Sequence, residues 1–524
     1  MTAAQGRALG PWQGVGLAFA AGIAAALAHP PFGLWIGIFA FSLLLLSLDR
    51  TPEQKPLRAA FLRGWAAGGG YMLVSTWWVA EAFFVDAANH GWQAPLAVLF
   101  LAGGIGLFWG GAGLAYRWIA SKRGVGLGAR RILVFAAVLS SFEWLRGHVL
   151  TGFPWDLPGE AWKAGSAPSQ AASLIGVYGL SFVTLAIGAA PVVLADRRSR
   201  SGAIALASAA AALALLWGYG AVRLAAGTPP DTTVRLRIVQ PGLSEEATWT
   251  DALFQQRFNR FLRLSAWPAA RRPDVVIWPE GAIPAPFSAY LAPGTWTEAE
   301  LAAALQPGQT LLDGGYRYSG PVGQQKAYNT LLMLRRGQTG FRVVGLYDKY
   351  RLVPFGEYLP FPQFFSLLHL TSLVQNGEPF SSGPRPAPVS IPGVPRMQPL
   401  ICYESLFPGF TSSHGGRPDW IVNVSDDAWF GQTTGPWQHL NLASYRAIEE
   451  GLPLIRATPT GVSAVVDPYG RVRAYLGLGR QGIIDTILPG RLEATSYSRL
   501  RELPFYMLLL VGLGASLMIN KPKL

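Results

Sequence analysis

Three residues of chemically reactive type each follow a short apolar run in the second half of the chain: Glu280, Lys349 and Cys402. If these runs are β-strands, their ends can bring a carboxylate, an ammonium and a thiol together in one domain. A thiol is mostly protonated at neutral pH, and a nearby carboxylate base and ammonium make the nucleophilic thiolate available. The ammonium can also stabilise the oxyanion that forms on an attacked carbonyl. The three residues are therefore a candidate catalytic triad.

Each member of this triad also has a purely structural interpretation. Cys402 is the only cysteine of the chain, so no intramolecular disulfide can form, and a lone cysteine at a strand end is often buried filler. Glu280 and Lys349 alone can be a surface ion pair of little energetic weight. The occurrence of all three favours catalysis. The six histidines show no metal-ligand spacing, so we expect no metal and no cofactor.

The elements that must position the triad lie between about residues 230 and 500, where short runs are broken by proline and glycine. Alternating or apolar runs predict β-strands at 233–240, 274–278, 310–313, 329–334, 343–347, 399–402 and 420–424. Helices are expected at 250–265 and 438–450. Strands that alternate with helices indicate an α/β domain.

The rest of the chain is far more apolar. Only 14% of the 524 residues are charged, 50% are hydrophobic, and the mean hydropathy is +0.27. This balance is wrong for a purely soluble protein of this length and excludes a disordered chain. Stretches long enough to cross about 30 Å of hydrocarbon lie at about 12–28, 32–48, 62–84, 93–116, 132–150, 171–194, 203–222 and 504–520. We therefore expect eight transmembrane helices.

The net charge of +13 belongs to these apolar regions, which argues against a nucleic-acid partner. From residue 231 to 502, 25 basic residues stand against 22 acidic ones, whereas the flanking regions hold 18 against 8. The basic residues cluster in alternate connections, as cytoplasmic loops do. Both termini are therefore expected in the cytoplasm, and the segment before the last span on the outer side, which is the periplasm in a bacterium. The predicted domains are 1–225, 226–500 and 501–524.

Four motifs of the outer segment carry a family resemblance. They are Trp278-Pro279-Glu280, Lys349 with 352–358, Cys402-Tyr403-Glu404, and 423–431. The set resembles the nitrilase superfamily and is most similar to its membrane-bound branch, the apolipoprotein N-acyltransferases. Residues 143–146 and 151–155 resemble the loop after the fifth span of that branch. The resemblance implies a domain of eight transmembrane helices and an extramembrane, nitrilase-like αββα sandwich inserted before the last helix.

The resemblance also implies roles for the candidate residues. Glu280 is expected to be the general base, Lys349 the cation that stabilises the oxyanion, and Cys402 the nucleophile. Glu357 is expected to orient Lys349 without contacting the substrate.

Further pocket residues follow from the same resemblance. Tyr403 and Glu404 are expected to shape the pocket behind the thiol, and Trp249 and Trp429 to line the path of lipid or peptide, although ordinary packing explains tryptophans equally well. The chain departs from the family pattern at Asp426, where an asparagine is usual, and at 457–461, which lacks an asparagine pair.

Apolar segments near the triad suggest a membrane-facing entrance. The segment 361–370, which contains Phe364 and Phe365, is too short to span a bilayer and is expected to dip into it as a lid; a buried core segment is the alternative. The segment 283–287 is a candidate second lipid-contacting arm. Glu143 and Arg146, three apart on a helical face, are expected either to pair with each other or to contact a lipid headgroup.

The implied reaction is the last step of lipoprotein maturation in the bacterial inner membrane. A phospholipid donates an acyl chain to Cys402 as a thioester, and the α-amino group of a diacylglyceryl-cysteine at an apolipoprotein N-terminus accepts it. The expected partners are these two substrates and membrane lipids, and the chain is expected to be a monomer. The alternative is a membrane-tethered nitrilase-type amidase, in which water replaces the amine. A non-enzymatic scaffold is disfavoured because the full reactive set is present.

Overall fold

Helices form the first part of the chain, and strands begin only at residue 235. The computed structural model describes residues 8–123, 128–196, 199–244, 249–360, 363, 379–412 and 415–517. Its contacts divide the chain into two units. The helical unit consists of Met1–Gly227, Thr433–Glu450 and Ala494–Leu524, and the sheet unit consists of Thr228–Gln432 and Gly451–Glu493.

The helical unit has helices at each of the eight predicted apolar stretches. Its helices are α1 (Pro11–Ala26), α2 (Ala40–Asp49), α3 (Pro56–Thr76), α4 (Ala87–His90), α5 (Ala94–Arg123), α6 (Ala129–His148), α7 (Ala172–Ala189), α8 (Arg200–Ala225), α13 (Gly435–Glu450), α14 (Ser496–Leu500) and α15 (Leu503–Gly514). Short 3-10 helices extend several of them, including Trp35–Phe39 before α2 and Ala190–Ala195 after α7.

Three helical segments among the described residues are long enough and apolar enough to cross a membrane: Ala87–Arg123, Pro168–Ala195 and Arg200–Ala225. Two further apolar helices, Trp35–Asp49 and Leu503–Leu517, are shorter. The helix positions therefore match the sequence-based expectation. The length and composition of the described helices support three membrane crossings and do not establish the eight that were expected.

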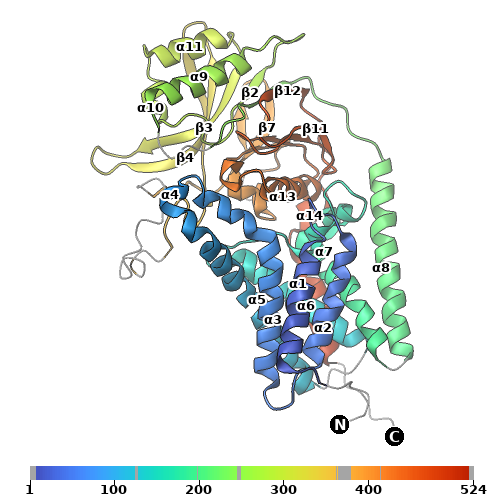
Figure 1. Cartoon of the computed structure of the whole chain (residues 1–524). Coiled ribbons are helices and arrows are strands. Elements are labelled where there is room, and N and C mark those ends of the chain that lie inside the picture. Colours follow the sequence, from blue (N-terminus) through green and yellow to red (C-terminus); the bar gives the residue numbers. More distant parts are fainter. Residues whose placement is uncertain are drawn as a thin grey trace. The chain divides into compact units, whose positions relative to one another are not determined.

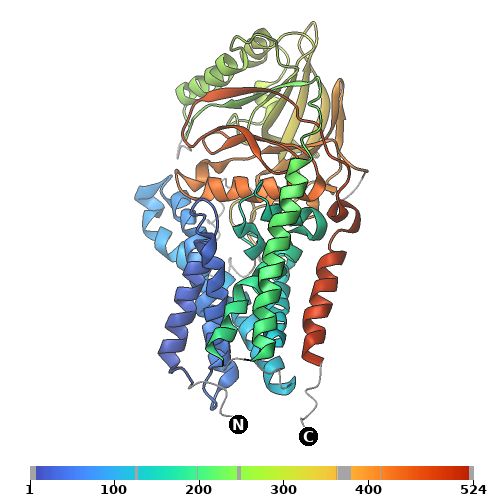
Figure 2. The ribbon, with the colours of Figure 1, turned by 90° about the vertical axis from the view of Figure 1, so that its right-hand side faces the viewer.

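Small residues let the long helices approach closely. In Figures 1 and 2, α1, α3, α5 and α6 lie side by side within the helical unit. A Cβ atom on Gly64 of α3 would lie only 2.2 Å from the carbonyl oxygen of Trp109 in α5, and one on Gly22 of α1 only 1.9 Å from that of Ala67 in α3. Glycine is therefore required at both crossings.

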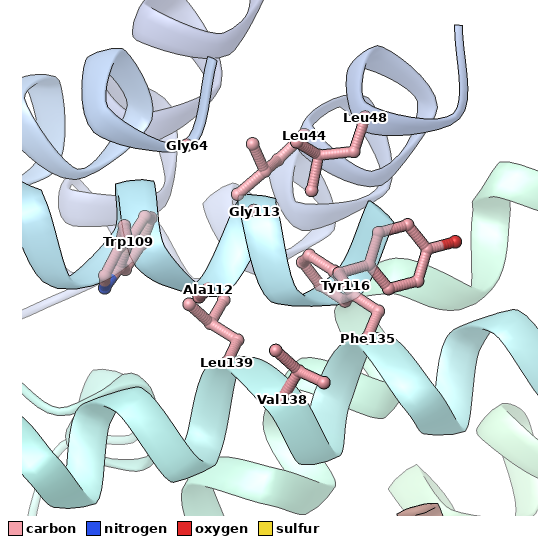
Figure 3. Close-up of a pocket in the computed structure, with 10 residues that line it drawn as sticks. All are labelled: Leu44, Leu48, Gly64, Trp109, Ala112, Gly113, Tyr116, Phe135, Val138 and Leu139. Atoms are coloured by element: carbon pink, nitrogen blue, oxygen red, sulfur yellow. The ribbon is translucent and has the colours of Figure 1, made fainter. Parts of the chain in front are cut away.

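A small apolar cavity remains between α2, α3, α5 and α6 (Figure 3). It is lined by Leu44, Leu48, Gly64, Trp109, Ala112, Gly113, Tyr116, Phe135, Val138 and Leu139. This lining contains no carboxylate, amine, imidazole or thiol, and the one phenol in it, Tyr116, donates a hydrogen bond to Asp49 Oδ1 at 2.7 Å. The cavity is a packing defect without catalytic groups.

Helix α13 belongs to the helical unit although the sequence-based boundaries place it in the outer domain. Its Asn441 donates to the carbonyl of Glu160 at 3.0 Å and accepts from the amide of Ala164 at 2.8 Å. Its Tyr445 donates to the carbonyl of Gly159 at 3.0 Å. These bonds tie α13 to the segment that follows α6, so the unit boundaries fall at 433 and 450 inside the predicted domain 226–500.

The sheet unit contains two six-stranded mixed sheets. The first has the order β12-β1-β2-β3-β4-β5 and the second the order β11-β10-β9-β8-β7-β6. The strands are β1 (Arg235–Gln240), β2 (Val275–Ile277), β3 (Thr310–Ser319), β4 (Lys326–Arg336), β5 (Phe341–Asp348), β6 (Val389–Ile391), β7 (Val394–Ile401), β8 (Trp420–Val424), β9 (Leu454–Ala457), β10 (Ser463–Val466), β11 (Val472–Leu476) and β12 (Gly482–Ile487).

One apolar core joins the two sheets. It contains fully buried residues of the first sheet, such as Ile277 and Leu331, together with Val422 and Ile455 of the second. A separate core lies on the other face of the first sheet, where α9 (Asp251–Ser265), α10 (Phe287–Tyr290) and α11 (Trp296–Ala304) cover it. In Figure 1, α9 and α11 lie over this side of β2 and β3. The sheet unit is thus a nitrilase-like sandwich with helices on its first sheet.

The segment 283–287 does not form the lipid-contacting arm predicted for it. Ile283 is 1% exposed and Phe287 6% exposed, and both belong to the core beneath α9 and α11. The run of prolines resembled an exposed arm, but its apolar side chains fill space beside Trp278 and Tyr290. Most of the predicted lid, 361–370, lies outside the described residues, including Phe364 and Phe365.

Candidate active site

The first sheet delivers a lysine between two carboxylates. Lys349 directly follows β5 and is 1% exposed. Its Nζ donates to Glu280 Oε1 at 3.1 Å and to Glu357 Oε1 at 3.0 Å. Burial on its own would lower the pKa of Lys349, but the two carboxylates outweigh it and raise that pKa well above its ordinary value. The ammonium is therefore permanently charged.

Asn329 of β4 completes this cluster, and the sequence analysis missed it. Its amide donates to Glu280 Oε1 and to Glu357 Oε1, each at 2.7 Å, so it bridges the same two oxygens as Lys349. The antiparallel pairing of β4 with β5 places it here, because Thr330 pairs with Asp348, and the amide of the next residue, Lys349, donates to the carbonyl of Asn329 at 2.8 Å. A polar amide inside a predicted apolar strand was the available signal.

Backbone amides hold the remaining carboxylate oxygens. The amide of Asp426, directly after β8, donates to Glu280 Oε2 at 2.8 Å. The amide of Val353 donates to Glu357 Oε2 at 2.7 Å. Both carboxylates are thereby fixed in one orientation, and Asp426 contributes its backbone amide to the site.

The second sheet delivers the thiol. Cys402 directly follows β7, opens the 3-10 helix Cys402–Leu406, and has a positive φ of 49°. This left-handed conformation is rare for a residue with a Cβ and marks a sharp turn at the strand end. Burial, and next the charge of Glu280, raise the pKa of the Cys402 thiol well above its ordinary value, while Lys349 lowers it. Burial and Glu280 thus favour the protonated thiol, whereas Lys349 favours the thiolate.

Glu404 braces the turn that carries the thiol. It is fully buried and accepts from the amide of Ile401 at 2.7 Å and from that of Tyr350 at 2.8 Å. The hydroxyl of Tyr347 donates to both of its oxygens at 2.9 Å. Burial raises the pKa of Glu404 to about 7. The carboxyl group of Glu404 thus links the turn that carries Cys402 to the loop that follows Lys349. The neighbouring Tyr403 packs edge-on against Phe407, with 5.1 Å between the ring centroids.

Known families match both parts of the chain. The model of the apolipoprotein N-acyltransferase N-terminal domain matches residues 21–190, and that of the carbon-nitrogen hydrolases matches residues 235–497. An apolipoprotein N-acyltransferase of Caulobacter vibrioides is 51% identical over 96% of this chain and 94% of its own length. The chain belongs to the apolipoprotein N-acyltransferase family.

Other members of the apolipoprotein N-acyltransferase family are similar over nearly the whole chain. Relatives of that name from Rhodopseudomonas palustris and Bradyrhizobium diazoefficiens are 35% and 38% identical, over 98% and 97% of this chain and 96% and 95% of their own lengths. The resemblance inferred from the motifs is confirmed, and the chain is an acyltransferase of the carbon-nitrogen hydrolase superfamily.

The two tryptophans that were expected to line a substrate path are both partly exposed. Trp249 is 38% exposed and packs against Arg257, whose Cζ lies 5.0 Å from the ring centroid. Arg257 in turn donates to the carbonyls of Gly281 at 3.0 Å and Ala282 at 2.8 Å, directly after Glu280. Trp429 is half-buried in the 3-10 helix Asp427–Phe430. The described contacts thus connect Trp249 to the loop that carries Glu280.

Glu143 and Arg146 lie in the helical unit and pair with each other. Both are at most 1% exposed. Arg146 Nη2 donates to Glu143 Oε2, and Arg146 Nη1 donates to the carbonyls of Phe153 and Trp155 at 2.6 and 2.9 Å. Of the two expectations for these residues, the structure shows the ion pair between Glu143 and Arg146. Contact of either residue with a lipid headgroup stays a prediction.

Proposed function

We propose that this chain transfers an acyl chain from a phospholipid to the α-amino group of the N-terminal diacylglyceryl-cysteine of apolipoproteins, through a thioester on Cys402. The observation that carries the proposal is the arrangement of Lys349 between Glu280 and Glu357 in the same unit as the only thiol of an acyltransferase-family chain. A base, a fixed cation and a nucleophile are the groups that acyl transfer through a thioester requires.

In the first half-reaction the sulfur attacks the ester carbonyl of the phospholipid. Glu280 takes the thiol proton, the S–C bond forms, and the C–O bond to the glycerol oxygen breaks. The proton then passes to that oxygen, and lysophospholipid leaves. An ammonium has three N–H groups, and the described residues accept two from Lys349, so the third is available to the developing oxyanion.

In the second half-reaction the amine of the diacylglyceryl-cysteine attacks the thioester. The N–C bond forms, the C–S bond breaks, and Glu280 carries the proton lost by the amine to the departing sulfur. Glu357 and Asn329 hold Lys349 in place through both steps, and Glu404 and Tyr403 keep the cysteine turn rigid. The proposal assigns no step to a metal or a cofactor.

The site of action in the proposal is the bacterial inner membrane. Eight helices cross it, both termini are cytoplasmic, the catalytic domain 226–500 is periplasmic, and the chain acts as a monomer. The apolar helices and the alternation of basic connections support this topology. Phe364, Phe365, Trp249 and Trp429 are the proposed residues of the lipid or peptide path, and Glu143 and Arg146 are the proposed contacts to a lipid headgroup.

Mass spectrometry of the full-length protein tests the proposal. After incubation with phospholipid in detergent, we expect one acyl mass on the Cys402 peptide, and we expect a diacylated lipopeptide to discharge it as a triacylated product. Discharge by water at the same rate without the lipopeptide would instead identify the membrane-tethered hydrolase. An unmodified Cys402 beside acylated lipopeptide would refute the thioester.

A further inference from the structure

Three neighbouring parallel strands place a serine beside the thiol. In β7 and β8, Ile401 pairs with Val424, so the residues that follow, Cys402 and Ser425, come next in register. The hydroxyl of Ser425 hydrogen-bonds to the Cys402 thiol. Ser425 is fully buried, and its amide donates to the carbonyl of Ala457 in β9 at 3.0 Å. The sulfur therefore has a fixed polar neighbour on the second sheet.

While Cys402 is protonated, the proton of this serine goes to a carboxylate. Ser425 Oγ donates to Asp427 Oδ1 at 2.8 Å. A hydroxyl has one proton and two lone pairs, so the lone pairs of Ser425 Oγ remain to accept the S–H of Cys402. This bond selects one rotamer of the thiol while it is protonated.

A fully buried arginine holds the aspartate. Arg456 Nη2 donates to both oxygens of Asp427, at 2.8 and 2.7 Å, and both side chains are 0% exposed. Arg456 Nη1 also donates to Asn423 Oδ1, whose amide donates to the carbonyl of Leu400 at 3.1 Å. The guanidinium is thus anchored to the strands that carry the cysteine and the serine.

Removal of one partner from such a pair leaves a buried charge, which costs several kcal/mol and acts on neighbouring groups. The groups that act on the thiol are Glu280, Lys349, Asp427 and Ser425. Burial, Glu280 and Lys349 have the largest effects on the thiol pKa. The negative charge of Asp427 also raises this pKa, and the Ser425 hydrogen bond lowers it. Arg456 neutralises Asp427 and so limits its effect.

We propose that Arg456, Asp427 and Ser425 form a positioning chain for the Cys402 sulfur: Arg456 neutralises and fixes Asp427, Asp427 fixes the Ser425 hydroxyl, and Ser425 orients the thiol. The three are positioning residues, because none of them forms a bond to the acyl group. The inference rests on the proposed function only in taking Cys402 as the nucleophile.

The pH profile of alkylation of Cys402 by iodoacetamide tests this chain in the full-length protein. Cys402 is the only cysteine, so intact-mass spectrometry reports its modification directly. Ser425→Ala removes a donor to the thiolate and is expected to raise the midpoint of the profile. Arg456→Gln exposes the thiol to an uncompensated Asp427 and is expected to raise it by about one pH unit. Asp427→Asn removes the charge and is expected to lower it.

The double variant Asp427→Asn with Arg456→Gln is expected to return the midpoint close to that of the wild type, because the opposite charges leave together. A merely structural role predicts the same direction for all three single variants, or unchanged midpoints with reduced thermal stability, and either result would overturn the proposal. If Arg456→Gln does not fold, the opposite shifts of the alkylation midpoint expected for Ser425→Ala and Asp427→Asn still test the proposal.

Matched controls come from the same unit. Ser265→Ala removes a buried serine that accepts from Trp278 Nε1 at 2.8 Å, and Arg237→Gln removes a buried arginine paired with Asp485 at 2.7 Å. Both are expected to lower stability without moving the alkylation midpoint, and a shift as large as that of the chain variants would contradict the proposal.

Alkylation needs no lipid, so this inference and the proposed function fail separately. Unchanged midpoints in variants of a protein whose Cys402 still becomes acylated would refute the positioning chain alone. If the midpoints shift as expected in a protein whose Cys402 never becomes acylated, the proposed function is refuted but the positioning chain is supported.

Discussion

Two buried clusters of carboxylates and cations differ in how completely they are satisfied. In the helical unit, Arg146 donates to Glu143 and to the carbonyls of Phe153 and Trp155, and one carboxylate balances one cation. In the sheet unit, Lys349 lies between two carboxylates, which leaves an excess negative charge and one N–H without an acceptor among the described residues. A closed pair stabilises a fold, whereas an unbalanced cluster with a remaining donor is arranged for a reacting group.

The largest expected effect comes from removing the proposed nucleophile. Cys402→Ala is expected to abolish lipid-dependent acyl transfer, and Cys402→Ser is expected to leave at most traces, because a serine hydroxyl is far harder to ionise than a thiol. The measurement is conversion of a diacylated lipopeptide to the triacylated form. Normal acyl transfer by the Cys402→Ala variant would show that the sheet-unit cluster takes no part in catalysis.

Equivalent changes in the two clusters should separate catalysis from stability. Lys349→Gln is expected to lower kcat about 10²- to 10³-fold, because an oxyanion donor is lost. Arg146→Gln leaves Glu143 buried and unpaired and is expected to cost about 3–5 kcal/mol of stability. Kinetics on the folded fraction, together with thermal unfolding, measures both effects. A reversed pattern, with Arg146 controlling kcat, would make the helical cluster part of the site.

Two bridging asparagines give a finer version of the same contrast. Asn329→Ala removes two hydrogen bonds to carboxylates that Lys349 also holds, and is expected to lower kcat by about 10- to 100-fold, the effect of losing about one bond to a charged group at about 1.5–3 kcal/mol. Asn441→Ala removes the bonds of α13 to Glu160 and Ala164 and is expected to lower the melting temperature at unchanged kcat. Equal kcat losses in both variants would mean that the first effect is also structural.

A further expected effect is a pH dependence of stability, which changes no catalytic group. Burial raises the pKa of Glu404 from an ordinary 4.5 to about 7 in the folded chain. Its protonated form is therefore favoured by folding, so the stabilisation is complete below pH 4.5 and is lost as the pH rises through 7, by up to about 1.4 kcal/mol per pH unit. Thermal unfolding between pH 4.5 and 7.5 measures this slope, and Glu404→Gln is expected to reduce it.

Asp313 supplies the matched control for Glu404. Burial raises its pKa from 3.8 to about 7 as well, and its partner is the hydroxyl of Tyr290 at 2.7 Å, outside the catalytic cluster. Asp313→Asn is expected to reduce the same slope without changing acyl transfer, whereas Glu404→Gln is expected to slow it, because an amide cannot accept from donors on both sides. Equal kinetics in the two variants would contradict the bracing role of Glu404.

The strand-end residues were predictable because apolar runs and local motifs identify a strand and the residue that leaves it. Glu280 after β2, Lys349 after β5 and Cys402 after β7 follow this rule. Asn329 and Arg456 lie inside strands, and their roles depend on which strands pair, which no local pattern reports. The same limit explains why β6 and β9 to β12 were not predicted.

Burial was the other property that local patterns could not fix. Residues 283–287 combine proline with apolar side chains, a composition that suits an exposed arm or a core equally well, and only the packing of α9 and α11 decides for the core. Helix α13 was predicted nearly correctly in length, but its membership of the helical unit follows from bonds to residues about 280 positions away in sequence.

The placement of α13 has a practical consequence for anyone who dissects this enzyme. The chain passes from one unit to the other after Gly227, Gln432, Glu450 and Glu493, so neither unit is a continuous piece of polypeptide. Every residue of α13 except Trp437 is buried, and a fragment that starts near 228 and stops near 493 would carry this helix without its partners. A gene truncation or a single protease cut therefore cannot separate the two units, and engineering or crystallisation should begin from the undivided chain.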